Sequence, residues 1–119
     1  MIGRQLVADE LELISGAISA AAADLIVTTG GTGLAARDVT PEATAKVIDL
    51  VVPGLGEEMR RAGLASTPAS LLSRGIAGVR GTALVLNLPG SVRGATESLA
   101  AVLPALGHAL DLLQGETSH

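Results

Sequence analysis

The sequence predicts a single domain of the α/β class, in which helices cover a mainly parallel β-sheet. Two apolar runs, LIVTT at 25–29 and TALVLNL at 82–88, are typical of buried parallel strands. They alternate with segments whose apolar residues recur at helical spacing. The chain has 119 residues, with no visible linker or repeat. This length suits one domain, spanning 1–119, that buries about two thirds of its unfolded surface.

The composition limits both the core and the partners. Hydrophobic residues make up 48% of the chain, yet Phe, Trp and Tyr are absent. The core must therefore be aliphatic, and any ligand ring must be held by aliphatic walls and backbone groups. The net charge of −4 argues against binding to nucleic acid or an anionic membrane. The absence of cysteine excludes disulfides, thiolate zinc sites and cysteine nucleophiles.

The sequence carries no targeting or membrane-spanning signal. The first ten residues, MIGRQLVADE, reach two carboxylates before any apolar stretch, unlike a signal peptide. The alanine-rich run at 16–27 is interrupted by Asp24 and is too short to cross a bilayer. We therefore expect a soluble cytoplasmic protein.

The first half of the chain predicts two strands, each followed by a helix. RQLVAD at 4–9 reads as a short strand, and apolar spacing predicts a helix over about 10–23. The strand at 25–29 then leads through a glycine-rich loop to a helix start. There, Thr40 is the expected N-cap and Pro41 fits the first turn.

The second half continues with helices and a hairpin. LGEEMRRA at 55–62 predicts a helix, and TPASLL at 67–72 predicts another start that is capped by threonine and led by proline. GIAGVRG at 75–81 reads as a hairpin or an irregular edge before the strand at 82–88.

The final helix is expected to begin after the PGS turn, with Ser91 as its N-cap. Pro104 should kink or split this helix. The last five residues, GETSH, read as a frayed tail. The predicted apolar face of the helix consists of Leu99, Val102, Leu103, Leu106, Leu110 and Leu113.

Three polar segments follow predicted strands: Asp9-Glu10, the loop at 30–38 and the segment at 87–91. Ligands of open α/β sheets bind outside the carboxyl ends of the strands. We therefore expect the three segments to meet in one crevice.

The stretch TTGGTGLAARDVTPEAT at 28–44 predicts a phosphate site. Glycine turns are often purely structural, but here the turn joins a buried strand to a helix N-terminus, which favours anions. Asp38 and Asp9 together fit Mg²⁺, which binds through one or two carboxylates plus phosphate oxygens. Alternatively, Asp38 is a turn residue, and Asp9 and Glu10 complement the dipole of the following helix.

Other charged residues are weaker candidates. Arg74 reads either as an anion ligand or as a surface charge, and Arg60, Arg61 and Arg4 read as solvated. His108 lies among leucines at helical spacing, which suggests the rim of the core. No Ser-His-Asp arrangement or zinc cluster is visible.

Four motifs together resemble the molybdopterin adenylyltransferase family, which is related to the N-terminal domain of gephyrin. They are the stretch at 28–44, PGLGEEMR, LSRGIAGVRG and LVLNLPGS, and the resemblance runs from about Val7 to Leu113. It implies a three-layer α/β/α fold, usually a homotrimer, and transfer of AMP from Mg-ATP to the terminal phosphate of molybdopterin. Close relatives of the same fold bind pterin or act on tungsten cofactor instead.

The resemblance also implies roles for particular residues. Asp38 and Asp9 are expected to be catalytic and to hold Mg²⁺. The phosphate- and nucleotide-binding residues are expected to be Gly30, Gly31, Thr32, Gly33, Ser73, Arg74, Pro89, Gly90 and Ser91.

The chain departs from the family in two places. Val92-Arg93 stands where the family commonly has Pro-Lys, so a basic group is kept. A first strand-helix unit of roughly 30 residues has no counterpart here. In the family the missing strand lies between those matching 4–9 and 25–29, which could here pair directly. Two further readings are a non-catalytic pterin- or nucleotide-binding relative and an incomplete fragment of the enzyme.

Overall fold

A computed structural model describes residues 3–115. Helices and strands alternate in the first half of this part of the chain, as the apolar pattern predicts, and a 3₁₀ helix and a hairpin follow in the second half. The elements are α1 (Leu11–Ala20), β1 (Leu25–Thr29), α2 (Thr40–Val47), β2 (Leu50–Val51), α3 (Pro53–Gly63), the 3₁₀ helix η1 (Pro68–Leu72), β3 (Ala77–Arg80), β4 (Ala83–Leu88) and α4 (Val92–Leu113).

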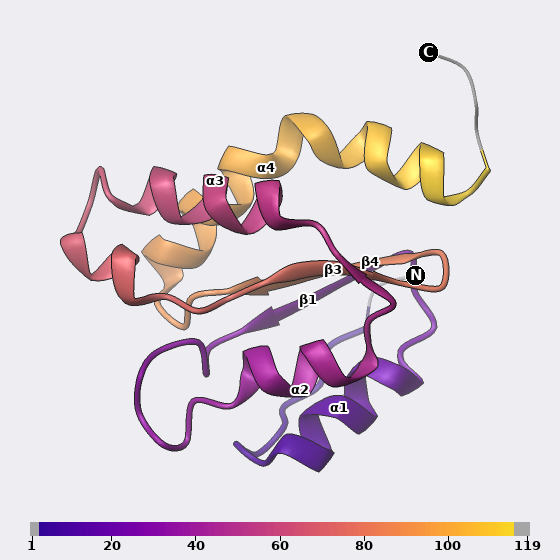
Figure 1. The fold of residues 1–119 in the computed structure, drawn as a ribbon, viewed down its shortest axis with the longest axis horizontal. Coiled ribbons are helices and arrows are strands. Elements are labelled where there is room, and N and C mark those ends of the chain that lie inside the picture. The colour runs from indigo at the N-terminus through magenta and orange to yellow at the C-terminus, as the bar shows by residue number, and fades with distance from the viewer. Residues whose placement is uncertain (1–2, 116–119) are drawn as a thin grey trace.

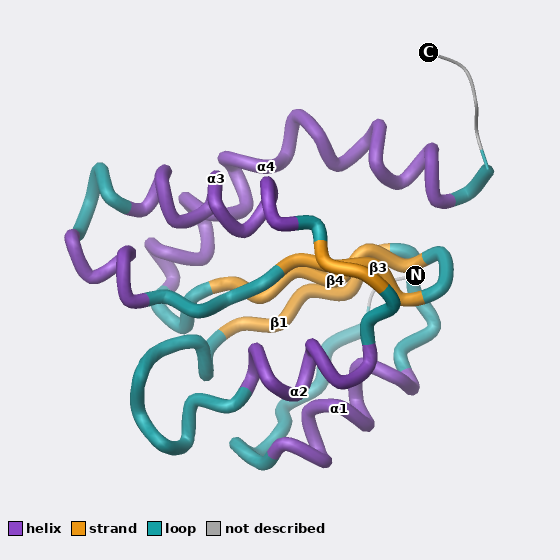
Figure 2. Tube along the Cα trace, in the orientation of Figure 1, coloured by secondary structure: helices purple, strands orange, loops and turns teal. Residues whose placement is uncertain are grey.

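The elements form three layers, which confirms the predicted α/β/α arrangement (Figures 1 and 2). The central sheet has the strand order β1-β4-β3-β2. Helices α3 and α4 cover one face, and α1 and α2 cover the other. The apolar run of β1 and the loops that follow β1 and β4 are thereby held on one rigid frame.

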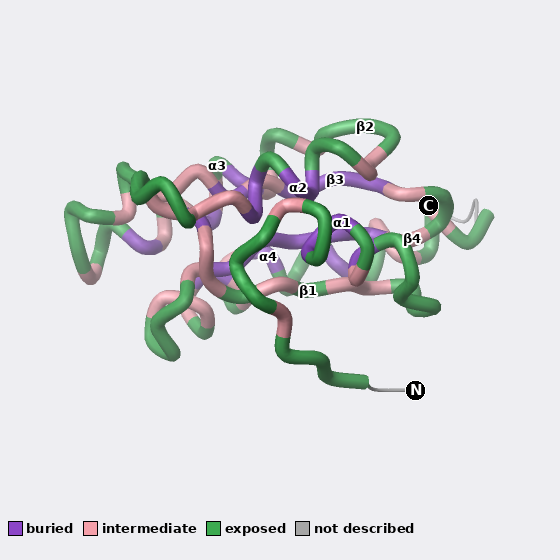
Figure 3. The backbone as a smooth tube through the Cα atoms, turned by 90° about the horizontal axis from the view of Figure 1, so that it is seen from below, coloured by how far each residue is buried: buried purple, intermediate pink, exposed green. Residues whose placement is uncertain are grey.

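Strand β4 supplies core residues to both faces because its side chains alternate. Leu84, Leu86 and Leu88 belong to the apolar cluster beneath α3 and α4. Val85 belongs to the second cluster, with residues of α1 and α2. Such a strand reads as a continuous apolar run, and Figure 3 shows that the neighbouring β3 is mostly buried as well.

The prediction of a mainly parallel sheet is wrong, because the sheet is mixed. Strands β1 and β4 are parallel, with Leu25 opposite Leu84. Strands β3 and β4 are antiparallel, as are β2 and β3. The cause is the two-residue connection between Arg80 and Ala83, since a turn this short joins only antiparallel strands. This hairpin lies within the sheet, with β2 on its far side.

The prediction of a first strand at 4–9 is also wrong. These residues have no regular secondary structure, and they face β1 across a cavity of about 670 Å³ that separates the two segments. Leu6 is 98% exposed. A strand needs a hydrogen-bonded neighbour, and across this cavity the segment does not pair with β1.

The predicted helix starts are confirmed in two cases and corrected in one. The hydroxyl oxygen of Thr67 accepts a hydrogen bond from the Ala69 N–H (3.2 Å), and that of Ser91 accepts one from the Gly94 N–H (3.0 Å). Thr40, by contrast, is already helical, and the N-cap position of α2 is taken by the preceding residue, without a side-chain bond. The reason is that the Thr40 N–H donates to the carbonyl oxygen of Gly31 (3.1 Å).

Helix α4 is one continuous helix across Pro104, so the proline does not split it. Val102 and Leu106 are buried, as predicted, but Leu103 is 59% exposed. Leu103 follows Val102 directly and so lies about 100° around the helix from it, outside the apolar stripe. Within residues 3–115, no helix has the length and apolarity to cross a membrane. The predicted frayed tail lies mostly outside the described residues.

Candidate functional site

The loops that follow β1 and β4 lie side by side. Because these two strands are parallel, their carboxyl ends reach the same edge of the sheet. The N–H of Gly30 donates to the carbonyl oxygen of Leu88 (3.0 Å), which joins the start of one loop to the end of the other strand. The predicted convergence is therefore confirmed for the segments 30–38 and 87–91. It is wrong for the third segment, Asp9-Glu10, because Asp9 lies beside the other cavity, of about 670 Å³.

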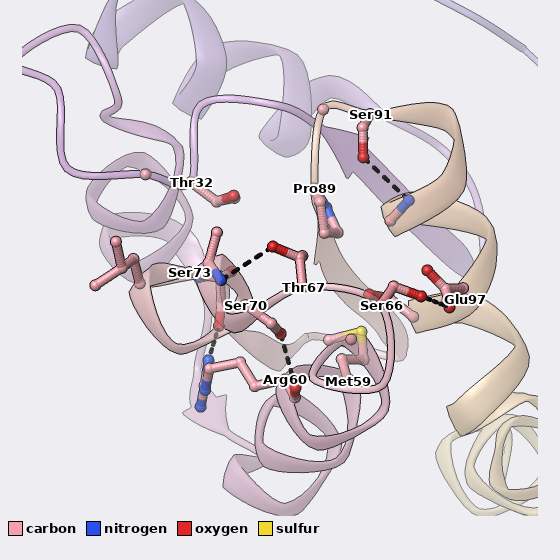
Figure 4. A pocket seen from close by; sticks show the side chains of 18 of the residues that line it. Thr32, Met59, Arg60, Ser66, Thr67, Ser70, Ser73, Pro89, Ser91 and Glu97 are labelled. Atoms are coloured by element: carbon pink, nitrogen blue, oxygen red, sulfur yellow. Dashed lines mark hydrogen bonds between the residues drawn. The ribbon is translucent and has the colours of Figure 1, made fainter.

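A cavity of about 650 Å³ opens beside these loops, between α3, η1 and the start of α4 (Figure 4). This volume suits a small-molecule ligand. Most of the predicted binding residues line it: Thr32, Gly33, Ser73, Pro89, Gly90 and Ser91.

The cavity has a hydroxyl-rich wall, of which only Ser73 was predicted from the sequence. Ser66, Thr67 and Ser70 line it together with Ser73, and Figure 4 shows them around one space. All four lie in the stretch STPASLLS. Its many hydroxyl residues are the feature of the sequence from which this wall could have been predicted. Such a wall offers hydrogen bonds that can serve a polar ligand in the absence of aromatic side chains.

Charged side chains of both signs border the cavity. Arg60 is partly buried and donates from Nη1 to the carbonyl oxygen of Gly75 (2.8 Å). The prediction that Arg60 lies on the solvated face of its helix is therefore wrong, because its side chain is part of the cavity wall. Glu97, also at the cavity, accepts a hydrogen bond from the Ser66 hydroxyl and lies 3.6 Å from Arg93.

The N-terminus of α4 gives the cavity an anion-favouring end. Gly90, Ser91 and Gly94 all line the cavity, and Ser91 caps the helix. The free N–H groups of a helix N-terminus and its dipole attract negative charge. Together with the hydroxyls of the opposite wall, this end of the cavity suits a phosphate.

The glycine loop after β1 is shaped by Gly31. Its φ of +69° is a conformation that favours glycine, and a Cβ there would overlap the hydroxyl oxygen of Thr40. Gly30 and Gly31 line the second cavity, whereas Thr32 and Gly33 line the first. The loop thus separates the two cavities and divides the predicted phosphate residues between them.

Asp38 and Asp9 are placed differently from each other. Asp38 lines neither cavity, and its Oδ2 accepts a hydrogen bond from the Ala35 N–H (3.0 Å) within the loop. Asp9 is exposed and lines only the second cavity. It directly precedes Glu10, the N-cap residue of α1. This agrees with the alternative prediction that Asp9 and Glu10 complement the dipole of the following helix.

The residues present fit Mg²⁺ through few protein ligands. Within residues 3–115 there is no group of three or more His, Cys, Asp or Glu side chains that could hold a metal ion. Mg²⁺ commonly uses only one or two carboxylates together with substrate phosphates. Asp38, beside the glycine loop, is the carboxylate predicted to hold the ion, and this role stays a prediction.

Arg74 does not line the first cavity, although its neighbours Ser73 and Gly75 do. Its guanidinium instead donates to the carbonyl oxygens of Gly33 (2.8 Å) and Asp38 (2.6 Å). It is also paired with the carboxylate of Glu42 in the first turn of α2, and this hydrogen bond holds the pKa of Glu42 below its ordinary value. A phosphate-binding role for Arg74 stays a prediction.

Asn87 forms a buried polar centre at the base of the site. Its side chain is 2% exposed, and its Nδ2 donates to the hydroxyls of Thr28 and Thr44, each at 3.0 Å. Its Oδ1 accepts from the Ile76 N–H (3.2 Å). One side chain thereby ties β1, α2 and β4 together beneath the loops.

Comparison with known proteins identifies the family to which this chain is similar. Residues 1–108 match the family described as probable molybdopterin binding domain. A molybdopterin adenylyltransferase of Helicobacter pylori is 46% identical over 115 residues, covering 93% of this chain and 65% of that protein. Gephyrin of Dictyostelium discoideum is 46% identical over 92 residues, covering 77% of this chain and 13% of that protein.

A solved structure shares the fold. The molybdopterin biosynthesis enzyme MoaB of Thermus thermophilus superposes with a TM-score of 0.82 at 57% identity, covering 90% of this chain and 70% of that one. The present chain spans 65% of the length of its Helicobacter relative. The match over residues 1–108 and these similarities show that the chain belongs to the molybdopterin-binding domain family.

Proposed function

We propose that this protein acts in molybdenum cofactor biosynthesis and transfers AMP from ATP to the terminal phosphate of molybdopterin. Its similarity to a molybdopterin adenylyltransferase supports this reaction. The observation that carries the proposal is the cavity of about 650 Å³ where the glycine loop meets the N-terminus of α4. In this proposal the whole chain acts as one molybdopterin-binding domain.

The two ends of the cavity suggest how the substrates lie. Gly90 and Ser91 at the start of α4, with Thr32 and Gly33 opposite, offer N–H and hydroxyl donors for phosphates. Met59, which is buried, and the hydroxyl-rich wall line the rest of the cavity, which suits a pterin or adenine ring held without aromatic stacking.

The reaction requires positioning more than covalent chemistry. An oxygen of the terminal phosphate of molybdopterin attacks the α-phosphorus of ATP in line, a new P–O bond forms, and the bond to pyrophosphate breaks. The donors of the glycine loop and of the α4 N-terminus would stabilise the charge on the transferring group. When bound, Mg²⁺ would supply further charge neutralisation. Asp38 would hold it, with Asp9 as the second expected catalytic carboxylate.

Assembly and location belong to the same proposal. A homotrimer is the expected state, and exposed large apolar side chains such as Leu71 (68%) and Leu72 (55%) agree with association. We expect a cytoplasmic location.

A second candidate function is binding of a pterin or nucleotide without transfer. The placement of Asp9 at the second cavity and of Asp38 outside both cavities favours this alternative, because the two carboxylates do not share one pocket.

A label-transfer assay distinguishes the two functions. The full chain is incubated with molybdopterin, Mg²⁺ and ATP labelled at the α-phosphate. The product is then separated and identified by its label and its molecular mass. Transfer predicts labelled, adenylylated molybdopterin together with pyrophosphate. We expect Asp38→Asn to abolish the product, whereas the matched control Asp24→Asn, at an exposed site before β1, retains it. Binding of ATP without any product would support the second function and reject the first.

A further inference from the structure

Arg74 uses both its backbone and its side chain to hold the loop that follows β1. Its N–H donates to the carbonyl oxygen of Thr32 (2.8 Å). Its Nε donates to Gly33 O (2.8 Å), and its Nη2 donates to Asp38 O (2.6 Å). Its Nη1 is paired with the carboxylate of Glu42. The rigid fork of a guanidinium suits such simultaneous contacts, whereas a lysine ammonium cannot reproduce them.

The contacts of the guanidinium close one segment of chain. Gly33 and Asp38 mark the two ends of this segment, and both carbonyl oxygens accept from the same side chain. The four residues between them, 34–37, are all exposed. Inside the segment, Asp38 Oδ2 accepts from the Ala35 N–H (3.0 Å) and the Asp38 N–H donates to Ala35 O (2.9 Å). Arg74 therefore fixes a loop that has little other support.

The guanidinium works beside the cavity, not inside it. Ser73 and Gly75 line the cavity, but Arg74 between them does not. Through its bonds it holds Thr32 and Gly33, on the loop side of the cavity, against the segment that carries Ser73. The side chain thereby sets the position of the loop wall relative to the wall formed by η1.

We infer that Arg74 is a positioning residue. It holds the loop from Gly33 to Asp38 in the shape that keeps Thr32 and Gly33 on the wall of the cavity, where the phosphates of a nucleotide are proposed to lie, and it does not contact the ligand itself. The ion pair with Glu42 fastens this clamp to α2. The effect on turnover rests on the proposed function, but the effect on the loop does not.

Hydrogen exchange of the full 119-residue chain tests the clamp without any substrate. Arg74→Lys should speed exchange of the two hydrogen-bonded amides of the loop, those of Ala35 and Asp38, about tenfold, because it removes two or more hydrogen bonds that hold the loop. Glu42→Gln, which keeps Arg74, should speed it about threefold, as expected for an exposed ion pair. Amides of β4 should exchange as in the wild type in both variants.

The chain offers matched controls for both variants. Arg61 and Glu58 form another exposed ion pair, on α3, with Nη2 of Arg61 at 2.7 Å from Oε2 of Glu58. Arg61→Lys and Glu58→Gln should leave exchange at 34–38 unchanged. Unchanged loop exchange in both Arg74→Lys and Glu42→Gln would overturn the inference.

Turnover separates positioning from ligand contact. Arg74→Lys should lower kcat for adenylyl transfer about tenfold or more while KM for ATP changes less than about threefold, because the chemistry and not the binding loses its geometry. A raised KM with wild-type loop exchange would mean that Arg74 binds phosphate directly, which contradicts the inference. If the wild-type chain makes no adenylylated product, the proposed function fails, and the exchange result alone decides the clamp.

Discussion

Asn87 shows how one residue can carry both the fold and the floor of the site. Its amide contacts the hydroxyl of Thr44, which is fully buried, and the N–H of Ile76. Both groups would lose their partner if the amide were removed, and an unsatisfied buried polar group costs about 1–3 kcal/mol. The Asn87 side chain therefore contributes more to the free energy of unfolding than one residue of a strand ordinarily does.

Replacing Asn87 by Leu tests this network. We expect Asn87→Leu to lower the free energy of unfolding by at least about 2 kcal/mol, measured by urea denaturation. Thr96→Val serves as the control. It removes an exposed hydroxyl that donates to Val92 O (2.7 Å), and it should change stability by less than about 0.5 kcal/mol. Similar values for the two variants would show that the buried network contributes little.

Glu42 offers a residue-scale test of the Arg74 pair by pH. The hydrogen bond from Arg74 lowers the pKa of Glu42 below 4.5. A lowered pKa means that the stabilising pair is present above about pH 4.5 and is lost as the pH falls through the lowered value. The contribution is small, since exposed pairs are worth about 0.2–1 kcal/mol.

An NMR titration of the side-chain carboxyls measures this directly. In Arg74→Gln, the titration midpoint of Glu42 should rise toward 4.5, while that of Glu58, which is lowered by its own hydrogen bond from Arg61, should stay low. A Glu42 midpoint unaffected by the loss of Arg74 would contradict the ion pair.

At the scale of elements, the apolar pattern predicted the buried strands well and the first strand wrongly. Strands 25–29 and 83–88 were predictable because each is a continuous aliphatic run. The segment 4–9 has only a short apolar run, Leu6-Val7-Ala8, and pairing depends on a neighbouring strand, which local sequence does not specify. The two-residue strand at 50–51 is too short to give a pattern at all.

The site was predictable to a similar degree. The glycine loop and the PGS turn could be found because glycines and a capping serine mark them. The hydroxyl-rich wall and the orientation of Arg74 depend on how η1 packs across the loop, so spacing along the chain could not reveal them.

Strand β3 gives an element-scale prediction through Gly78, which lets β2 approach closely. A Cβ at this position would lie 2.7 Å from Leu50 O and 2.5 Å from Ile48 Cδ1. Gly78→Ala must therefore displace β2, and we expect a loss of about 1–3 kcal/mol in the free energy of unfolding.

The matched control lies in α4. A Cβ at Gly107 would meet no atom within 4 Å. Gly107→Ala should raise stability by about 0.5–1 kcal/mol, because alanine is the better helix former. In thermal or urea denaturation, the midpoint should fall for Gly78→Ala and rise for Gly107→Ala. A shift of both midpoints in the same direction would contradict the close approach of β2.

At the scale of the whole molecule, three layers bring the ends of β1 and β4 together beneath two loops. The arrangement places the phosphate-favouring groups on one rigid edge, while the chain between 34 and 37 stays exposed. In the proposed function, this frame supplies the phosphate-binding groups, and the Arg74 clamp sets the position of the loop.

Nucleotide binding should stabilise the folded molecule as a whole. Mg-ATP at a hundredfold excess over its Kd should add about 2.7 kcal/mol and raise Tm by several degrees. Gly31→Val, which places a branched side chain against Thr40, should abolish that rise. Gly54→Ala, where a Cβ meets no atom within 4 Å, should retain it. An equal rise in all three proteins would place the nucleotide away from the glycine loop.

The location of the bound phosphates shows which of the two cavities holds the nucleotide. A crystal structure of the full chain with Mg²⁺ and a non-hydrolysable ATP analogue should show phosphates between Thr32-Gly33 and Gly90-Ser91, in the cavity bordered by α3, η1 and α4. Phosphates bound in the second cavity beside Asp9, or elsewhere on the molecule, would contradict the account.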